Sequence, residues 1–413
     1  MTLEKIDYGV DELLKDEKIL DRFVKEIDKK VAGEKDSIRA ILLHLFSAWV
    51  KNITMKNHLL VNSESSAGKS FVCNAIRLIF PKEFFEYRTK ITPEALTYWK
   101  QDIEGWDWNG KILYLEDIRE DVLNSPTFKI MASEGSVATV VIKQKAYDIK
   151  INGSPVMLLT SAKATPNAEI VNRFGIINLD ESNEQTEKVI ERQLKNSALR
   201  ETEKYNIIFT EAIRRLLRCS VRIPDWINNL IEHIPIDLLR IRRDMPRFLD
   251  LIKASAIIHQ NQREFDIVNK VIWANEQDYE IARDVMDKID EAGGIYGLTH
   301  RNRKCLETCR RYFKEFESYF SAQEIYAYEP VVSEKMWKII LDKLAEKKLL
   351  NISLRKPDEE SRAKKPTTTF YPNSSVKMVL PSVKTLKEIK VIKPINILKE
   401  KSEKNKTRKK AIV

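Results

Sequence analysis

The stretch Val61-Asn62-Ser63-Glu64-Ser65-Ser66-Ala67-Gly68-Lys69-Ser70 decides the fold of this chain. An apolar run from His58 to Val61 precedes the loop of small residues, and an apolar-rich run from Phe71 to Ile79 follows it. This order predicts a strand, a loop and a helix, and the loop ends in Gly-Lys-Ser, the second half of a phosphate-binding P-loop. Ser63 stands where the pattern has its first Gly, which is costly if that position requires a positive φ.

The residue types in this loop suit a nucleoside triphosphate with Mg²⁺. Small residues let backbone N–H groups surround a phosphate, and Gly68 gives that backbone room. Lys69 can reach the β- and γ-phosphates, and the hydroxyl of Ser70 can ligate Mg²⁺. We therefore expect the whole loop to bind ATP, through Ser63, Glu64, Ser65, Ser66, Ala67, Gly68, Lys69 and Ser70.

A second motif is the apolar run Ile112 to Leu115, which ends in the carboxylates Glu116 and Asp117. It is typical of a Walker B strand, although most P-loop ATPases have Asp before Glu and this chain has the reverse order. We expect Glu116 to ligate Mg²⁺ and Asp117 to polarise the attacking water with a shorter reach than Glu. The alternative is a strand that ends in a solvated acidic turn.

Two further polar sites follow along the chain. The apolar run from Pro155 to Leu159 predicts a third strand, and Thr160 at its end is a candidate for orienting the lytic water. Arg173 lies just before another predicted strand, which suits an arginine finger that acts on the γ-phosphate of a neighbouring subunit. An ordinary surface charge is the alternative for Arg173.

In this order, the motifs resemble the AAA+ ATPase module of minichromosome-maintenance-type helicases. The likeness is closer to the helicase modules of phage and plasmid replication proteins, which are often fused to primases, and it runs from about Val31 to Asp290. Asp180-Glu181-Ser182-Asn183-Glu184-Gln185-Thr186 and Ala254-Ser255-Ala256-Ile257-Ile258-His259-Gln260-Asn261-Gln262-Arg263 carry the closer resemblance. It implies a homo-oligomeric ring, most often a hexamer, with single-stranded DNA in its pore and a primase or other replication proteins as partners.

The resemblance gives roles to two more segments. Alternating apolar and polar residues from Val137 to Ile151 predict a β-hairpin, and the resembled helicases carry a hairpin into the pore at this place. Lys143 and Lys145 at its tip would then hold phosphates of a threaded strand; an ordinary solvated tip is the alternative. In the Arg-rich stretch from Leu239 to Phe248, Arg247 or Arg243 would serve as the sensor 2 residue that reaches a phosphate.

The pattern after Gly293-Gly294 predicts three helices and a two-stranded ribbon, which is the order of a winged helix. Its third helix would enter a major groove of duplex DNA. The predicted wing loop would lie on phosphates through basic residues that include Arg355, Lys356, Lys364 and Lys365. A protein-contact module is the alternative.

Composition limits the class of protein. The 413 residues suffice for two or three domains, and no apolar run approaches the length of a membrane span. Four cysteines without a Cys-x-x-Cys pair, and an N-terminus without an apolar signal region, favour a reduced, cytoplasmic setting. The net charge is +10, and residues 376–413, with twelve Lys or Arg and three Glu, carry +9 of it. We expect this tail to be disordered and to contact nucleic acid, with a plain solubility tail as the alternative.

The sequence therefore predicts an α/β fold: an AAA+ P-loop ATPase domain with an α-helical lid, followed by a C-terminal winged-helix domain. The expected divisions are an N-terminal helical segment (1–50), the ATPase core (51–183), the lid (184–294), the winged helix (295–375) and the tail (376–413). The expected function is ATP-driven unwinding of DNA, or translocation on it, in replication of a virus or plasmid. The alternatives are a replication initiator or loader, and a DNA-binding regulator whose ATP site switches assembly.

Overall fold

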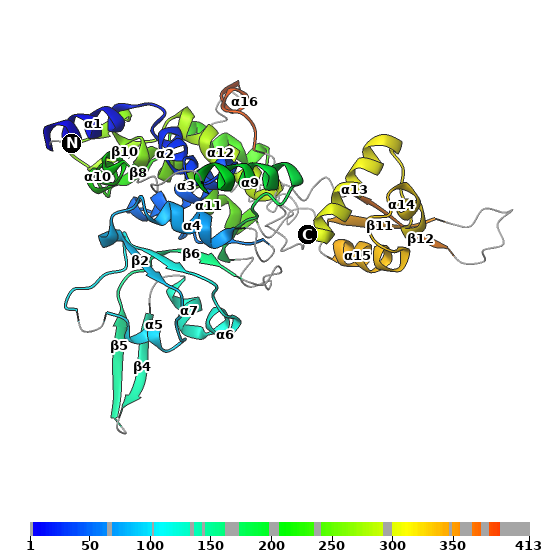
Figure 1. The fold of residues 1–413 in the computed structure, drawn as a ribbon, viewed down its shortest axis with the longest axis horizontal. Helices are drawn as coiled ribbons and strands as arrows, with labels where there is room; N and C mark the ends of the chain where they lie inside the picture. The colour runs from blue at the N-terminus through cyan, green and yellow to red at the C-terminus, as the bar shows by residue number, and fades with distance from the viewer. Residues whose placement is uncertain are drawn as a thin grey trace, which may run out of the picture.

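The computed structural model describes most of the chain (Figure 1). The described residues are 3–63, 68–100, 103–132, 136–142, 145–161, 173–197, 206–234, 241–291, 300–346, 349–355, 366–372 and 380–388. They form a body built around a parallel sheet, a hairpin that projects from this body, and a C-terminal group of helices with a ribbon.

The central sheet has five strands in the order β2-β3-β6-β1-β7. Every neighbouring pair runs parallel, so the carboxyl ends of all strands meet at one edge. The three middle strands are buried along their whole length, as expected for a parallel sheet that is covered on both faces. The strands are β1 (Leu59–Val61), β2 (Phe85–Arg88), β3 (Ile112–Leu115), β6 (Val156–Thr160) and β7 (Gly175–Ile177).

Short helices connect these strands and cover part of the sheet. The predicted helix after the P-loop is present, and a second, smaller core forms around Trp108, Phe128 and Phe174. Ser125 caps one of the helices by accepting a hydrogen bond from the backbone of Phe128. The elements are α4 (Lys69–Arg77), η2 (Lys82–Phe84), α5 (Ala95–Tyr98), α6 (Glu120–Asn124) and α7 (Pro126–Met131).

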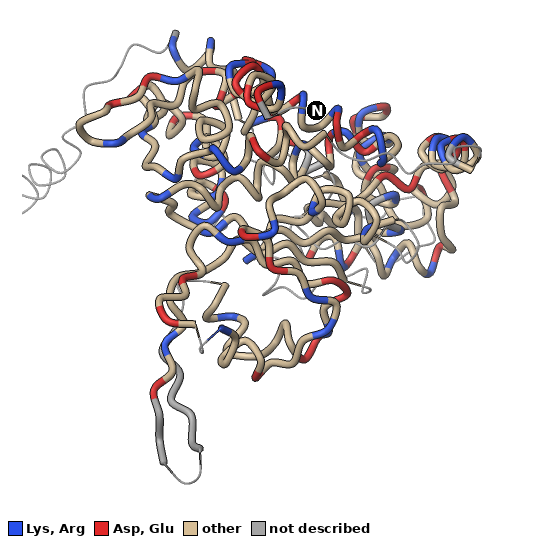
Figure 2. Tube along the Cα trace, turned by 60° about the vertical axis from the view of Figure 1, so that its left-hand side comes forward, with Lys and Arg blue, Asp and Glu red and all other residues tan. Residues whose placement is uncertain are grey.

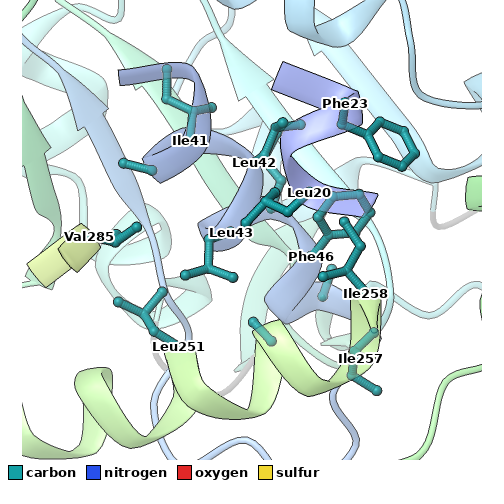
Figure 3. Packing of buried hydrophobic residues seen from close by; sticks show 14 of the residues in the cluster. Leu20, Phe23, Ile41, Leu42, Leu43, Phe46, Leu251, Ile257, Ile258 and Val285 are labelled. Carbon is teal, nitrogen blue, oxygen red and sulfur yellow. The ribbon is translucent and has the colours of Figure 1, made fainter. Parts of the chain in front are cut away.

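The N-terminal helices and the predicted lid pack together on the sheet. Figure 3 shows Phe23 and Phe46 from the N-terminal helices in the same cluster as Leu251 and Val285 from the lid. The N-terminal elements are α1 (Leu3–Lys15), α2 (Ile19–Asp28), α3 (Lys35–Phe46) and η1 (Ser47–Trp49). The lid elements are α9 (Asn183–Ser197), α10 (Ile207–Arg215), β8 (Ser220–Arg222), η3 (Asp225–Glu232), α11 (Ile241–Ile258), η4 (Gln260–Gln262), β9 (Phe265–Asp266), β10 (Val271–Trp273) and α12 (Glu276–Glu291).

This arrangement differs from the expected division of the chain. Residues 1–50, 51–183 and 184–294 all contribute to the larger hydrophobic core, so these ranges are not packed separately. The physical reason is that α3 is buried on nearly every side, so it needs both the sheet and the lid helices around it. The lid range is also not wholly helical, because β8, β10 and β9 form a small sheet.

A hairpin is inserted between the Walker B strand and β6, as predicted. It consists of β4 (Ser136–Ile142) and β5 (Lys145–Ile151), which pair antiparallel from Ser136 opposite Ile151 to Ile142 opposite Lys145. Figure 1 shows this hairpin projecting well beyond the rest of the body. Lys143, and the side chain of Lys145, lie outside the described residues.

The C-terminal group contains the predicted three helices and ribbon, and it has a core of its own. Trp337, Phe320 and Phe370 are fully buried at its centre. A capping box begins the second helix, where Ser321 and Glu324 each bond the other's backbone. The elements are α13 (His300–Phe316), α14 (Ala322–Tyr328), α15 (Glu334–Glu346), β11 (Leu350–Arg355) and β12 (Thr367–Pro372).

Residues 380–388 of the basic tail are ordered, which corrects the prediction that the tail, residues 376–413, is disordered. Helix α16 (Val383–Glu388) returns to the main body, where Leu386 is fully buried in the core. Tyr279 donates its hydroxyl hydrogen to the carbonyl oxygen of Pro381 at 2.7 Å, and Asn229 donates to that of Leu386 at 2.7 Å. Apolar residues within the basic run explain this docking, because their burial outweighs the charge around them.

Two composition-based expectations can be compared with the structure. Among the described helices, none combines the length and the apolar character needed to cross a bilayer. All four cysteines are buried free thiols, and Cys305 and Cys309 pack in the C-terminal core as expected for residues at helical spacing.

Candidate nucleotide-binding site

The P-loop begins where β1 ends, at the carboxyl edge of the sheet. Gly68 has φ 80° at the N-cap of α4, a conformation that suits glycine because other residues strain there. Ser63 is not among the described residues with positive φ, so the absence of the first Gly carries no backbone penalty at this position. The predicted contacts of Glu64, Ser65, Ser66 and Ala67 lie outside the described residues.

Lys69 lies inside the loop, with only 7% of its surface exposed. Its Nζ donates to the carbonyl oxygen of Ser63 at 2.7 Å, which folds the side chain back across the loop. Burial lowers the pKa of Lys69, and the negative charges of Asp117 and Glu181 act in the opposite direction. The lysine therefore lies close to both carboxylates at the position where a phosphate would approach. Sequence reasoning gave Glu181 no role, although it belongs to the quoted segment that follows β7.

Glu116 and Ser70 are brought together across the sheet edge. Burial opposes ionisation of Glu116, but hydrogen bonds from Ser70, Tyr87 and Asn74 outweigh it and leave its pKa below the ordinary value. Glu116 is therefore an ionised carboxylate that already contacts the P-loop hydroxyl. One hydroxyl and one carboxylate oxygen suit Mg²⁺, which takes few protein ligands and completes its shell with phosphate and water oxygens. This geometry fits the predicted metal-binding pair.

Three residues at this site were missed by sequence reasoning: Tyr87 on β2, and Asn74 and Arg77 on α4. The hydroxyl of Tyr87 donates to Glu116 Oε2. The guanidinium of Arg77 lies 4.4 Å from the ring centroid of Tyr87, and its Nε donates to Asn74 Oδ1 at 3.0 Å. Asn74 and Arg77 follow Ser70 by four and seven residues, so helical spacing from the P-loop serine was the available signal.

Asp117 follows Glu116 in a left-handed conformation, with φ 47°. Its backbone N–H donates to the hydroxyl of Thr160 at 2.9 Å, and Thr160 is completely buried. Strained backbone of this kind costs about 1–3 kcal/mol and persists only where surrounding contacts hold it. The hydroxyl of Thr160 thus contacts the turn that carries Asp117, which gives Thr160 a positioning role. Its predicted role in orienting the lytic water stays a prediction.

Arg173 lies at the opposite edge of the sheet from the P-loop. The backbone N–H of Gly175 donates to the carbonyl oxygen of His58 at 2.9 Å, which fixes the amino ends of β7 and β1 side by side. Arg173 precedes Gly175 by two residues, and its guanidinium donates to the carbonyl oxygen of Lys129 at 3.1 Å. A three-residue strand is roughly 10 Å long. The arginine is therefore separated from Lys69 of its own chain by the length of the sheet.

Arg247 is also near the amino edge, away from the P-loop of its own chain, and its predicted contact with a phosphate stays a prediction. It is 2% exposed and donates to Asp244 at 3.2 Å. Burial, together with the smaller effects of the charges of Lys56, Arg247 and Arg173, lowers the pKa of His58 to about 3. The reason for this position is that α11 packs against α3 and η1 instead of over the loop.

The other predicted sensor 2 residue, Arg243, is exposed in the first turn of α11. Its contact with a phosphate stays a prediction.

Of the four basic residues predicted to lie on DNA phosphates in the wing loop, the structure describes Arg355. Arg355 donates to Glu324 Oε1 at 2.7 Å and to the carbonyl oxygen of Tyr319 at 2.8 Å. These contacts tie the ribbon to the start of α14, and the predicted contact of Arg355 with DNA stays a prediction. Lys356, Lys364 and Lys365 lie outside the described residues.

The buried parallel sheet, with a lysine-bearing loop at its carboxyl edge and an acidic pair on a neighbouring strand, defines a P-loop domain. The chain belongs to the MTBMA_p00010 P-loop domain family, whose match spans residues 6–217, just over half of the 413 residues. No curated protein matches the chain. The family match agrees with nucleotide binding and includes the sheet, the P-loop and the N-terminal helices in a single unit.

Proposed function

We propose that this protein is an ATP-driven DNA translocase or helicase. It would work as a hexameric ring in replication of a virus or plasmid. The nucleotide would be ATP with Mg²⁺. Lys69 would hold its phosphates, and Ser70 and Glu116 would hold the metal. Asp117 would act on the attacking water. Mg²⁺ would supply charge neutralisation on the phosphates.

The observation that carries the ring proposal is the separation of Arg173 from Lys69 within one chain. An arginine finger must reach the transferring phosphoryl group, since it stabilises charge in the transition state. Arg173 is at the amino edge, and the P-loop is at the carboxyl edge. A second subunit whose carboxyl edge faces this amino edge would bring the two together. A ring repeats that contact until it closes.

The hairpin supports action on a nucleic acid strand. It follows α7 and leads into the amino end of β6, so it leaves the body at the edge of the sheet opposite the P-loop. In the view of Figure 2, acidic and basic residues are intermingled along much of the described chain. Contact with DNA phosphates would involve Lys143 and Lys145 at the tip and the tail after α16.

Two rival functions use the same nucleotide site. A replication initiator or loader would remodel DNA without processive unwinding, and a regulator would use ATP only to switch assembly. Neither needs a hairpin in a pore, so the hairpin favours the translocase. The C-terminal group would be a winged helix that contacts duplex DNA, or a protein-contact module of the same shape.

One experiment separates these functions. ATP hydrolysis is measured with and without single-stranded DNA, beside a strand-displacement assay, for the wild type, Lys69→Ala and the double variant Lys143→Ala/Lys145→Ala. We expect DNA to stimulate wild-type hydrolysis, Lys69→Ala to abolish it, and the tip variant to hydrolyse ATP without displacing a strand. Strand displacement by the tip variant at the wild-type rate would overturn the pore role. A rate of ATP hydrolysis that is the same with and without DNA would favour the regulator.

A further inference from the structure

The Walker B carboxylate of this chain has an anchor on the neighbouring strand. β2 and β3 pair in parallel with Tyr87 opposite Tyr114, and the hydroxyl of Tyr87 lies at the carboxyl edge, where Glu116 follows β3. There it donates to Glu116 Oε2, while Ser70 bonds the same carboxylate from the P-loop side. Glu116 is thus held by Ser70 of the P-loop and by Tyr87 and Asn74, which lie outside both motifs.

The anchor accounts for the departure of this motif from the usual order. Glu116 stands where most P-loop ATPases have Asp, and its side chain has one more rotatable bond. A longer carboxylate samples more positions and loses more conformational entropy when it is fixed at a metal. A hydrogen bond to one oxygen removes much of that freedom before the metal arrives. The extra length also allows the carboxylate to contact Tyr87 and Ser70 at once.

The tyrosine is itself held in place. Its ring lies 5.1 Å from that of Tyr114 and 4.4 Å from the guanidinium of Arg77. Arg77 in turn donates to Asn74, which hydrogen-bonds both Tyr87 and Glu116. A hydroxyl fixed by this packing can orient a partner at little further entropic cost.

We propose that Tyr87 is a positioning residue that preorganises Glu116 for Mg²⁺ and thereby sets the metal dependence of nucleotide binding. The inference rests on the proposed nucleotide site and deepens it. Tyr87 acts through Glu116 and does not itself touch metal or phosphate.

The test measures binding of a fluorescent ATP analogue over a series of Mg²⁺ concentrations, and in EDTA, so that it does not depend on turnover. Tyr87→Phe keeps the ring and its packing and removes only the hydroxyl. We expect this variant to need about three- to tenfold more Mg²⁺ for half-maximal binding, the usual effect of one lost hydrogen bond. Its affinity in EDTA and its melting temperature should match the wild type. Tyr98→Phe, which removes an exposed hydroxyl, is the matched control.

A double-mutant cycle identifies the residue through which Tyr87 acts. Glu116→Asp should shorten the carboxylate and break its contact with Tyr87, so adding Tyr87→Phe to it should change the Mg²⁺ requirement no further. Additive effects, or a Tyr87→Phe variant with the wild-type Mg²⁺ requirement, would overturn the proposal. Failure of the proposed function looks different: wild-type protein that binds the analogue with Mg²⁺ but never hydrolyses ATP would refute hydrolysis and leave the role of Tyr87 intact.

Discussion

The hydroxyl of Thr160 accepts a hydrogen bond from the backbone N–H of Asp117, at 2.9 Å, inside a fully buried strand end. This bond holds a left-handed residue next to Glu116, the carboxylate that we propose binds Mg²⁺, since Asp117 has φ 47°. Thr160→Val is close in shape but leaves the N–H without that partner. We expect it to lower the turnover of ATP about 10²-fold or more, through misplacement of Asp117, with ATP affinity little changed. Thr160→Ser retains a hydroxyl and should recover most of the rate. Steady-state kinetics of the two variants provide the check, and equal loss in both would contradict the positioning role.

The position of Arg173 predicts complementation between two inactive variants. Lys69→Ala has a defective P-loop and an intact finger, and Arg173→Ala has the reverse. Each should be inactive alone, because removal of a finger costs about 10³- to 10⁵-fold in rate. In a mixture, some junctions pair an intact P-loop with an intact finger, so ATP hydrolysis should reappear. Co-assembly is verified by light scattering on DNA. A co-assembled mixture without activity would mean that Arg173 is not a finger in trans.

The ordered α16 changes how the tail should be tested. A chain that ends at Glu388 keeps the docked helix and loses nine basic residues. We expect weaker DNA binding and a flatter dependence of its logarithm on salt concentration, since each lost phosphate contact lowers the slope by about 0.7–0.9. Titrations at several salt concentrations measure this slope. An unchanged slope would identify the tail as a solubility element.

A shorter chain that ends at Val379 tests the docking itself. It also lacks α16, so the buried side chains of Val383 and Leu386 leave the core. We expect its melting temperature to fall below that of the chain ending at Glu388, and amide exchange to rise in η3 and α12, which α16 contacts. Leu386→Asp in the full-length chain should give the same result without truncation. Identical melting of the two truncated chains would show that α16 adds no stability.

Two buried histidines predict loss of stability in mild acid. Burial lowers the pKa of His44 to about 4 and that of His58 to about 3, both below the ordinary 6.5. His58 is fixed as the neutral tautomer, since it accepts from the backbone of Met157 and donates to the carbonyl oxygen of Ala132. Between about pH 6.5 and 4 the unfolded chain binds more protons than the folded one, so stability is complete above this window and falls as pH falls through it.

The expected slope is about 1.4 kcal/mol per pH unit for each histidine. Urea unfolding at pH 7 and pH 5 measures the loss, to which carboxylates contribute as well. Nitrogen chemical shifts of labelled histidine isolate the cause, because His44 and His58 should stay neutral at pH 5. Protonation of both with midpoints near 6.5 would contradict the assignment.

The sequence by itself determined the elements that local pattern controls. The apolar runs before the P-loop and before Glu116-Asp117 predicted two strands of the sheet, because a strand buried on both faces is apolar at every position. The alternation of apolar and polar residues from Val137 to Ile151 predicted the hairpin, because successive residues of a strand point to opposite faces. The spacing of three helices and a ribbon was also readable after residue 300. These features depend on residues that are close together in the sequence, so they can be predicted from a single sequence.

Tertiary structure alone decided which residues meet. Tyr87 reaches Glu116 because β2 pairs with β3 in one register, and no local pattern encodes that register. Thr160 contacts a backbone amide, Arg247 lies at the amino edge, and Arg355 bonds α14, and local sequence pattern predicted none of these positions. The burial of Leu386 far from its own module is of the same kind. Such contacts depend on packing between distant segments, where the burial of shared apolar surface, and not sequence order, selects the neighbours.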